Sequence, residues 1–161
     1  MSNETASNDR MRRMMLIGRS KAGKTTLCQR INHEDLHYHK TQTVQVINNT
    51  MIDTPGEYLE RFGFRGALIV TSADAGIIVF VQAATEQGTM FPPLFSSMFG
   101  SKSIIGAVTK CDIATEEQKE KAAKYLTTAG AKEIFFVSSY TGEGVPELLE
   151  RIQTLGEEKS Q

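Results

Sequence analysis

The chain has 161 residues, enough for a single domain with a complete hydrophobic core. Its 18 Lys and Arg side chains nearly balance its 19 Asp and Glu side chains, which gives no sign of a nucleic-acid partner. Hydrophobic residues make up 40% of the chain, and the longest apolar run, residues 77–81, is far shorter than the roughly 20 residues of a membrane span, so no membrane partner is expected.

The domain is predicted to cover residues 11–157, between a disordered tail at residues 1–10 and a short C-terminal tail at residues 158–161. The first tail is polar and lacks the apolar core of a signal peptide, so a cytoplasmic location is expected. With no sign of secretion, the two cysteines, Cys28 and Cys111, are expected to stay reduced.

The first half of the chain alternates strands with helices. Residues 14–17 form an apolar run that stops at Gly18, which predicts a buried strand, and residues 25–31 continue as a helix. Strands are predicted at residues 43–47 and 50–52, joined by a turn at Asn48 and Asn49, and a helix is predicted at residues 64–72.

The second half continues the alternation. Residues 76–81 and 104–108 are continuous apolar runs, typical of parallel strands covered on both faces. Two prolines restrict any helix within residues 90–100 to a short one, or to one that begins at the prolines. The remaining predicted elements are a helix at 115–128 capped by Thr115 and Gly130, a strand at 134–137, and an amphipathic helix at 145–155.

This order predicts an α/β fold with an open, mainly parallel sheet and right-handed crossovers. In such sheets ligands bind at the carboxyl ends of the strands. Each motif described below follows a predicted strand, which is where that rule places function.

The first motif is GRSKAGKT, residues 18–25, which fits the phosphate-loop pattern G-x-x-x-x-G-K-[ST]. Gly18 and Gly23 permit backbone angles that turn successive N–H groups around an anion, and the following helix adds its positive end. Lys24 is expected to reach the outer phosphates, and the Thr25 hydroxyl to bind Mg²⁺. The residues expected to touch nucleotide here are Gly18, Ser20, Lys21, Ala22, Gly23, Lys24, Thr25 and Thr26.

The second motif is TKCD, which begins at Thr109 directly after a predicted strand. Guanine presents two adjacent N–H donors that the Asp112 carboxylate would accept together, whereas adenine presents an acceptor there. The stem of Lys110 is expected to lie against the base. The segment SSYTG completes the pocket through Ser138, Ser139 and Tyr140, with a backbone N–H, favoured as that of Ser139, donating to the guanine carbonyl.

The motifs GRSKAGKT, DTPG, TKCD and SSYTG, in this order, resemble the G motifs of Ras-like, translation-factor-related P-loop GTPases. The segment HYHKTQTV followed by IDTPGEYLE is similar to a narrower family, the EutP/PduV proteins of ethanolamine and propanediol utilisation. The resemblance implies a three-layer P-loop NTPase fold (a Ras-like G domain), with GTP or GDP and Mg²⁺ as cofactors. It also implies work near a bacterial microcompartment, with a shell or scaffold protein as partner.

The two switch segments of such a protein respond to the γ-phosphate. Thr41 is favoured over Thr43 as the first-switch ligand of Mg²⁺, because Thr43 begins a strand-like alternation. Asp53 is expected to hold a water on Mg²⁺, and the Gly56 N–H to contact the γ-phosphate. The three histidines between the phosphate loop and this strand offer a less favoured metal site, against a role as solvated loop residues: His33, His37 and His39.

Glu57 follows Gly56, at the position where many GTPases keep a glutamine that positions water. An ionised carboxylate only accepts hydrogen bonds and would face phosphate charge, so slow intrinsic hydrolysis is predicted. Beside Lys24, the catalytic candidates are Glu57 itself and Lys21, whose ammonium would stand in for an activating potassium ion. An activating partner protein is the other source of the missing group, and a solvent-facing Lys21 is the simpler interpretation.

Three functions stay open on the sequence. The leading one is a GTP-binding switch or slow GTPase. The second is a phosphotransferase that passes a phosphoryl group to a small carboxylate, as an acetate kinase does, and ATP preference would favour it. The third is a non-hydrolysing assembly adaptor whose bound nucleotide only orders the switches.

Overall fold

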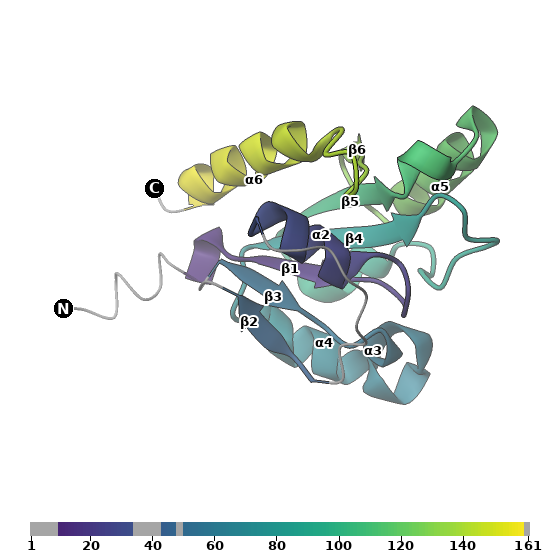
Figure 1. Ribbon diagram of the computed structural model, residues 1–161. Coiled ribbons are helices and arrows are strands. Elements are labelled where there is room, and N and C mark those ends of the chain that lie inside the picture. Colours follow the sequence, from purple (N-terminus) through teal and green to yellow (C-terminus); the bar gives the residue numbers. More distant parts are fainter. Residues whose placement is uncertain (1–9, 34–42, 48–49, 160–161) are drawn as a thin grey trace.

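The computed structural model describes residues 10–33, 43–47 and 50–159. Within them lies a six-stranded sheet of order β2-β3-β1-β4-β5-β6 (Figure 1). Only the β2–β3 pair is antiparallel, so the predicted mainly parallel sheet is confirmed. The strands are β1 Met14–Ile17, β2 Gln45–Ile47, β3 Met51–Asp53, β4 Ile77–Ala83, β5 Ser103–Thr109 and β6 Ile134–Phe136.

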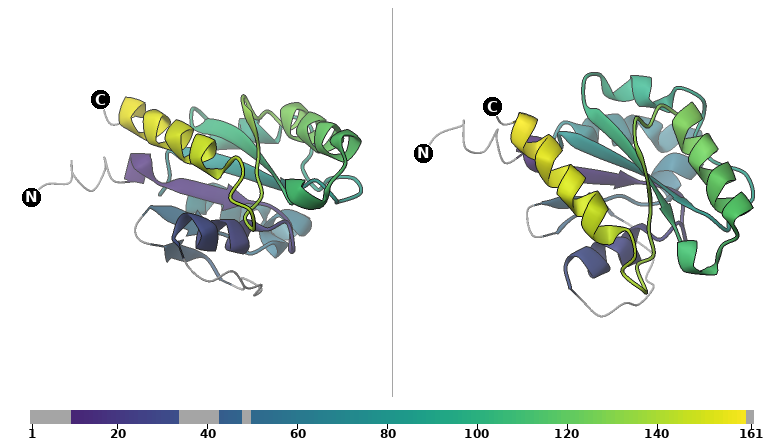
Figure 2. Two further views of the ribbon diagram at one scale, coloured as in Figure 1. Left: turned by 45° about the horizontal axis from the view of Figure 1, so that its top comes forward. Right: turned by 90° about the horizontal axis from the view of Figure 1, so that it is seen from above.

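Helices cover both faces of the sheet, which makes three layers (Figure 2). Side chains of β1 alternate between two cores because successive residues of a strand point to opposite faces. Met15 packs with residues of α4 and α5, whereas Leu16 packs with residues of α2 and α6. The α-helices are α2 Lys24–Ile31, α3 Glu57–Glu60, α4 Arg65–Ser72, α5 Glu116–Thr128 and α6 Val145–Lys159.

Three short 3-10 helices fill the connections. They are η1 Phe62–Phe64, η2 Phe95–Phe99 and η3 Cys111–Ile113. The η2 helix begins after Pro92 and Pro93, which confirms that the prolines leave room only for a short helix there. The predicted cap of α5 is also confirmed, because Thr115 and Gln118 exchange side-chain and backbone hydrogen bonds of 2.9 and 3.1 Å.

The last helix is longer than predicted. It continues through Gly156 to Lys159 instead of ending at Leu155. Gly156 is buried, and a Cβ built on it would lie 3.4 Å from the Cα of Arg12. Gly156 thus packs α6 against the segment before β1, at a distance where an added Cβ would make an ordinary van der Waals contact.

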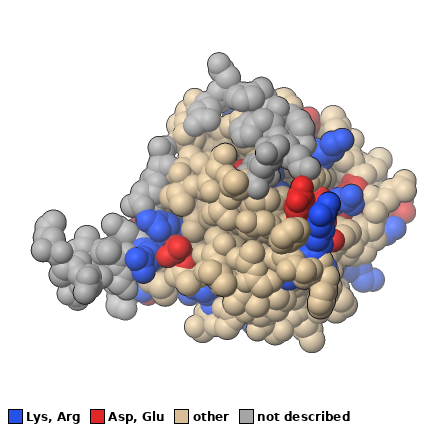
Figure 3. Space-filling view, turned by 90° about the horizontal axis from the view of Figure 1, so that it is seen from below, with Lys and Arg blue, Asp and Glu red and all other residues tan. Residues whose placement is uncertain are grey.

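The side of the molecule that carries α3 and α4 is poor in charge. Seen from below, it presents a broad uncharged area (Figure 3). Four large apolar side chains of η1 and α4 are exposed: Phe62, Phe64, Ile69 and Val70. No helix in the described ranges is long and apolar enough to cross a membrane.

Candidate nucleotide-binding site

The carboxyl ends of β1, β3, β5 and β6 bring the predicted loops together at one edge of the sheet. There they enclose a cavity of about 250 Å³. Its described lining consists entirely of residues that the sequence predicts as nucleotide contacts: Lys21, Gly23, Thr26, Thr109, Lys110, Asp112, Ser139 and Tyr140. The cavity thus joins the phosphate loop to the base-reading loop.

The phosphate loop is curled by two residues with positive φ. Gly23 has φ 95° and Lys21 has φ 67°, a conformation that a non-glycine residue rarely adopts. A Cβ on Gly23 would lie 3.3 Å from the Thr109 hydroxyl, so the loop packs tightly against the end of β5. The helix α2 begins directly afterwards at Lys24, which aims its N-terminus at the loop.

Lys24 is held inside this curl. Its Nζ donates to Gly18 O at 2.7 Å and to Arg19 O at 3.2 Å, and only 6% of the residue is exposed. Burial lowers the pKa of Lys24, and the nearby Asp53, Cys28 and Glu60 oppose that shift. A buried ammonium of this kind favours an anion at the mouth of the loop.

The two predicted Mg²⁺ residues within the described chain lie together. Thr25 Oγ1 donates to Asp53 Oδ2 at 2.8 Å, and Asp53 is fully buried. A hydroxyl and a carboxylate are hard oxygen donors, which fits Mg²⁺. The Thr54 hydroxyl donates to Leu16 O at 2.7 Å, which fastens the DTPG turn to β1 and holds Asp53 in place.

The remaining predicted metal residues are placed differently. Thr41 lies outside the described residues, as do His37 and His39. His33 follows α2 with φ 57°. Within the described ranges no three His, Cys, Asp or Glu side chains come together as a metal site.

Asp112, the carboxylate predicted to read the base, is oriented by its neighbours. Ser138 Oγ donates to Asp112 Oδ1 at 2.9 Å and accepts from Thr141 N at 3.2 Å. Ser139 is buried beside it, whereas Tyr140 is 66% exposed at the rim of the cavity. One carboxylate oxygen is thereby fixed by the protein, which sets the direction in which Asp112 presents itself to a ligand.

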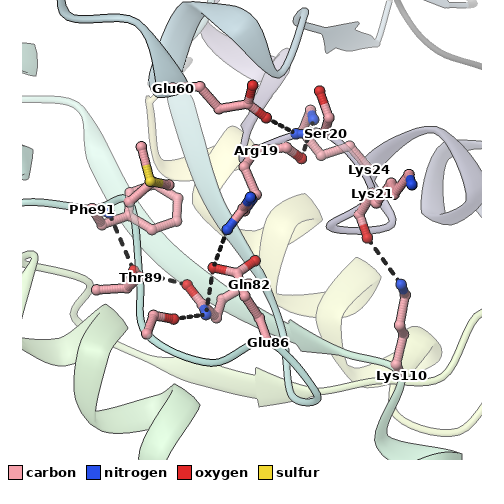
Figure 4. Close-up of polar contacts among 12 residues, drawn as sticks. Arg19, Ser20, Lys21, Lys24, Glu60, Gln82, Glu86, Thr89, Phe91 and Lys110 are labelled. Carbon is pink, nitrogen blue, oxygen red and sulfur yellow. Dashed lines mark hydrogen bonds and ion pairs between the residues drawn. The ribbon is translucent and has the colours of Figure 1, made fainter.

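The base-reading loop is tied directly to the phosphate loop. Thr109 Oγ1 donates to Ala22 O at 2.6 Å in the interior. Lys110 Nζ donates to Lys21 O at 2.9 Å, as Figure 4 shows. Both bonds end on backbone carbonyls, so they do not depend on the rotamers of their acceptors. The two halves of the cavity therefore form one connected unit.

The Glu60 carboxylate, which the sequence reasoning missed, reaches the backbone of the phosphate loop. Glu60 is the last residue of α3, and its Oε1 accepts a hydrogen bond from the Ser20 N–H at 2.6 Å (Figure 4). Burial on its own would raise the pKa of Glu60, but the bonds from Ser20 and the charges of Arg19 and Lys24 lower it overall. Glu57 begins the same helix and is half-buried. An acidic residue one helical turn after the DTPG sequence was the available signal.

A second contact that sequence reasoning missed lies on the other side of the phosphate loop. Arg19 Nη1 is 3.7 Å from Glu86 Oε2, in the connection that follows β4 (Figure 4). Gln82 Nε2 donates to the same carboxylate oxygen at 3.1 Å and to Gly88 O at 2.9 Å. The second residue of the phosphate loop is thus braced by a polar cluster at the end of β4.

A phosphate loop, a DTPG turn and the oriented Asp112 carboxylate, set on a mainly parallel sheet, define a P-loop NTPase fold. In keeping with this class, the chain is 28% identical to the GTPase Era of Mycoplasmopsis pulmonis, over 86% of this chain and 53% of Era. Residues 11–154 match the PduV-EutP family, described as "Ethanolamine utilisation - propanediol utilisation". The chain belongs to this family.

PduV and EutP proteins are among the relatives that cover most of the chain. The propanediol utilization protein PduV of Citrobacter freundii is 41% identical over 86% of this chain and 91% of its own length. The probable acetate kinase EutP of Escherichia coli K12 is 28% identical over 90% of this chain and 91% of its own length. These likenesses confirm the family that the sequence motifs resemble.

Proposed function

We propose that this chain binds GTP and GDP, hydrolyses GTP slowly with Mg²⁺, and serves as a switch or accessory factor in ethanolamine or propanediol utilisation. The observation that carries the proposal is the cavity that joins the phosphate loop to Asp112. A cavity of this form suits a ligand with an anionic end and a base that offers two adjacent donors. The distant likeness to GTPases supports the same ligand.

In the proposed complex, the curled loop and Lys24 hold the phosphates, and Asp112 accepts from the guanine edge. The Thr25 hydroxyl would hold Mg²⁺ directly and Asp53 through a water, with Thr41 as the proposed further ligand. Mg²⁺ supplies charge neutralisation at the phosphates. The protein's own contribution is to orient these groups before the nucleotide arrives, because the bonds from Thr54 and Ser138 fix them.

For catalysis, we propose a low intrinsic rate. Glu57 offers only acceptors when ionised, so it orients water poorly beside phosphate charge. Lys21 lies in the loop with an exposed side chain and contributes to the cavity wall. The test compares GTP turnover in wild type, Lys21→Ala and Glu57→Gln, with and without potassium. Unchanged rates across this set would remove both residues from the mechanism.

The main test is a titration with GTP, GDP and ATP in the presence of Mg²⁺, followed by measurement of phosphate release. Tight GDP binding and weak ATP binding are expected, together with loss of guanine preference in Asp112→Ala. Thr128→Ala, an exposed change on α5 away from the cavity, is the control. Equal affinity for ATP and GTP in the wild type would contradict the proposal.

A second candidate is a phosphotransferase that uses ATP and a small carboxylate. It is favoured by the relatives whose printed name is probable acetate kinase EutP. The test incubates the chain with ATP or GTP and acetate, and traps acyl phosphate as a hydroxamate. Acetate-dependent hydroxamate formation would establish this activity, and its absence with both nucleotides would exclude acetate as acceptor.

The partner and the location are also proposals. We propose a cytoplasmic protein that contacts a microcompartment shell or scaffold protein, and an activating protein that raises its turnover. The exposed apolar side chains of η1 and α4 support a partner that binds the side of the molecule carrying α3 and α4, the helices that follow the DTPG turn. A non-hydrolysing adaptor would bind such a partner equally in every nucleotide state, whereas a switch would not.

A further inference from the structure

The contact between Glu60 and Ser20 joins the end of α3 to the phosphate loop, across 40 residues of chain. At 2.6 Å it is short even for a hydrogen bond to an ionised acceptor. The backbone supports it, because a Cβ built on Gly56 would collide with Ser20 N. Gly56 and Glu60 therefore both lie against Ser20, the third residue of the phosphate loop.

The Glu60 carboxylate lies where a phosphate anion is expected to bind. The Ser20 N–H belongs to the series of loop donors that surround such an anion. The charges of Lys24 and Arg19 act on Glu60 as they would on a phosphoryl oxygen. A carboxylate oxygen and a phosphoryl oxygen are both anionic acceptors, so they compete for the same donor.

We propose that Glu60 is an internal anion that competes with the outermost phosphate of a nucleoside triphosphate, and so makes the site favour diphosphate. This inference rests on the proposed guanine-nucleotide function and adds a residue that determines specificity within it. A diphosphate ends before the Ser20 N–H, so it leaves the contact in place. A triphosphate must displace the carboxylate and, with it, the end of α3.

Displacement has a mechanical consequence that separates this role from a purely structural one. Glu60 is the last residue of α3, and the exposed Arg61 follows it. Release of Glu60 from Ser20 frees the backbone around Arg61, which is a trypsin site. Triphosphate is therefore expected to speed cleavage at Arg61, whereas diphosphate is not.

The experiment measures Kd for GDP and for a non-hydrolysable GTP analogue in wild type, Glu60→Gln, Glu60→Ala and Glu120→Gln. Glu120 is an exposed carboxylate on α5 and serves as the charge-matched control. Both Glu60 changes are expected to tighten analogue binding about tenfold, with GDP changed less than about twofold. Cleavage at Arg61 should become fast in Glu60→Ala with either nucleotide, and less so in Glu60→Gln, whose amide oxygen can still accept from the Ser20 N–H. Thermal melting verifies that each variant is folded.

Equal changes in Kd for GDP and the analogue, or no change in either, would overturn the role of Glu60 while leaving nucleotide binding intact. If the wild type binds no guanine nucleotide, the proposed function fails. The same variants are then compared with pyrophosphate and tripolyphosphate. A tripolyphosphate gain confined to the Glu60 variants supports the internal anion, and equal gains reject it.

Discussion

Replacement of Thr109 by valine tests whether the two halves of the cavity depend on one buried bond. Valine has nearly the shape of threonine but lacks the hydroxyl that donates to Ala22 O at 2.6 Å. Only 2% of Thr109 is exposed, so water has no access to the carbonyl that loses its donor. The substitution therefore removes one polar contact without opening a void.

The expected loss follows from this burial. A buried polar group that loses its partner costs about 2 kcal/mol in the free energy of unfolding. For a domain of this size that loss lowers Tm by about 4–8 °C. Because Ala22 belongs to the phosphate loop, the loosened loop must be ordered again on binding, and Kd for GDP is expected to rise about tenfold.

The matched control is Thr127→Val. The Thr127 hydroxyl also donates to a backbone carbonyl, that of Ala123 at 3.0 Å, but on the exposed side of α5. Its expected change in the free energy of unfolding is below about 0.5 kcal/mol, with GDP affinity unchanged. Thermal melting and GDP titration of both variants decide the matter. Equal destabilisation by the two substitutions would refute the reasoning that burial gives Thr109 its importance.

Three further predictions concern the same site and its surroundings. Gly66→Ala should stabilise α4 by about 0.5–1 kcal/mol, because nothing lies within 4 Å of the added Cβ. Gly56→Ala should instead lower both Tm and the affinity for the GTP analogue, because its Cβ collides with Ser20 N. Ser138→Ala should weaken GDP binding about tenfold, with less effect on pyrophosphate, because Asp112 loses its orienting bond. Burial raises the pKa of Glu86 above its ordinary 4.5, against the opposing effects of Arg19 and Gln82. The contribution of Glu86 to the free energy of unfolding is therefore fully present below pH 4.5 and is lost as the pH rises through the raised pKa. Glu86→Gln should therefore gain Tm relative to wild type at pH 7 but not at pH 4, as followed by melting across that range.

The contiguous motifs could be predicted from the sequence because their chemistry lies within a few residues of one strand end. Gly23, Lys24 and Thr25 lie where the phosphate-loop pattern predicts, and Asp53 ends β3 beside them. The position of Asp112 follows in the same way, because its motif comes directly after β5. Local spacing and strand order together therefore predict which loops form the cavity.

Contacts between distant loops were not predictable in the same way. The bond from Ser20 to Glu60 depends on how closely α3 packs on the phosphate loop, which spacing along the chain does not encode. The length of α6 was missed because the helical spacing of apolar residues stops at Leu155, whereas α6 continues through the buried Gly156, which packs against Arg12, to Lys159. In each case a tertiary contact decides between local alternatives.

The Thr109–Ala22 bond also sets an order of events during synthesis. Its partners are 87 residues apart, so the phosphate loop leaves the ribosome long before the residue that anchors it. Until β5 is complete, the loop lacks its support from Thr109 and Lys110. The proposed site is completed later still, after β6, because Ser138 orients Asp112 and because Ser139 and Tyr140 line the cavity.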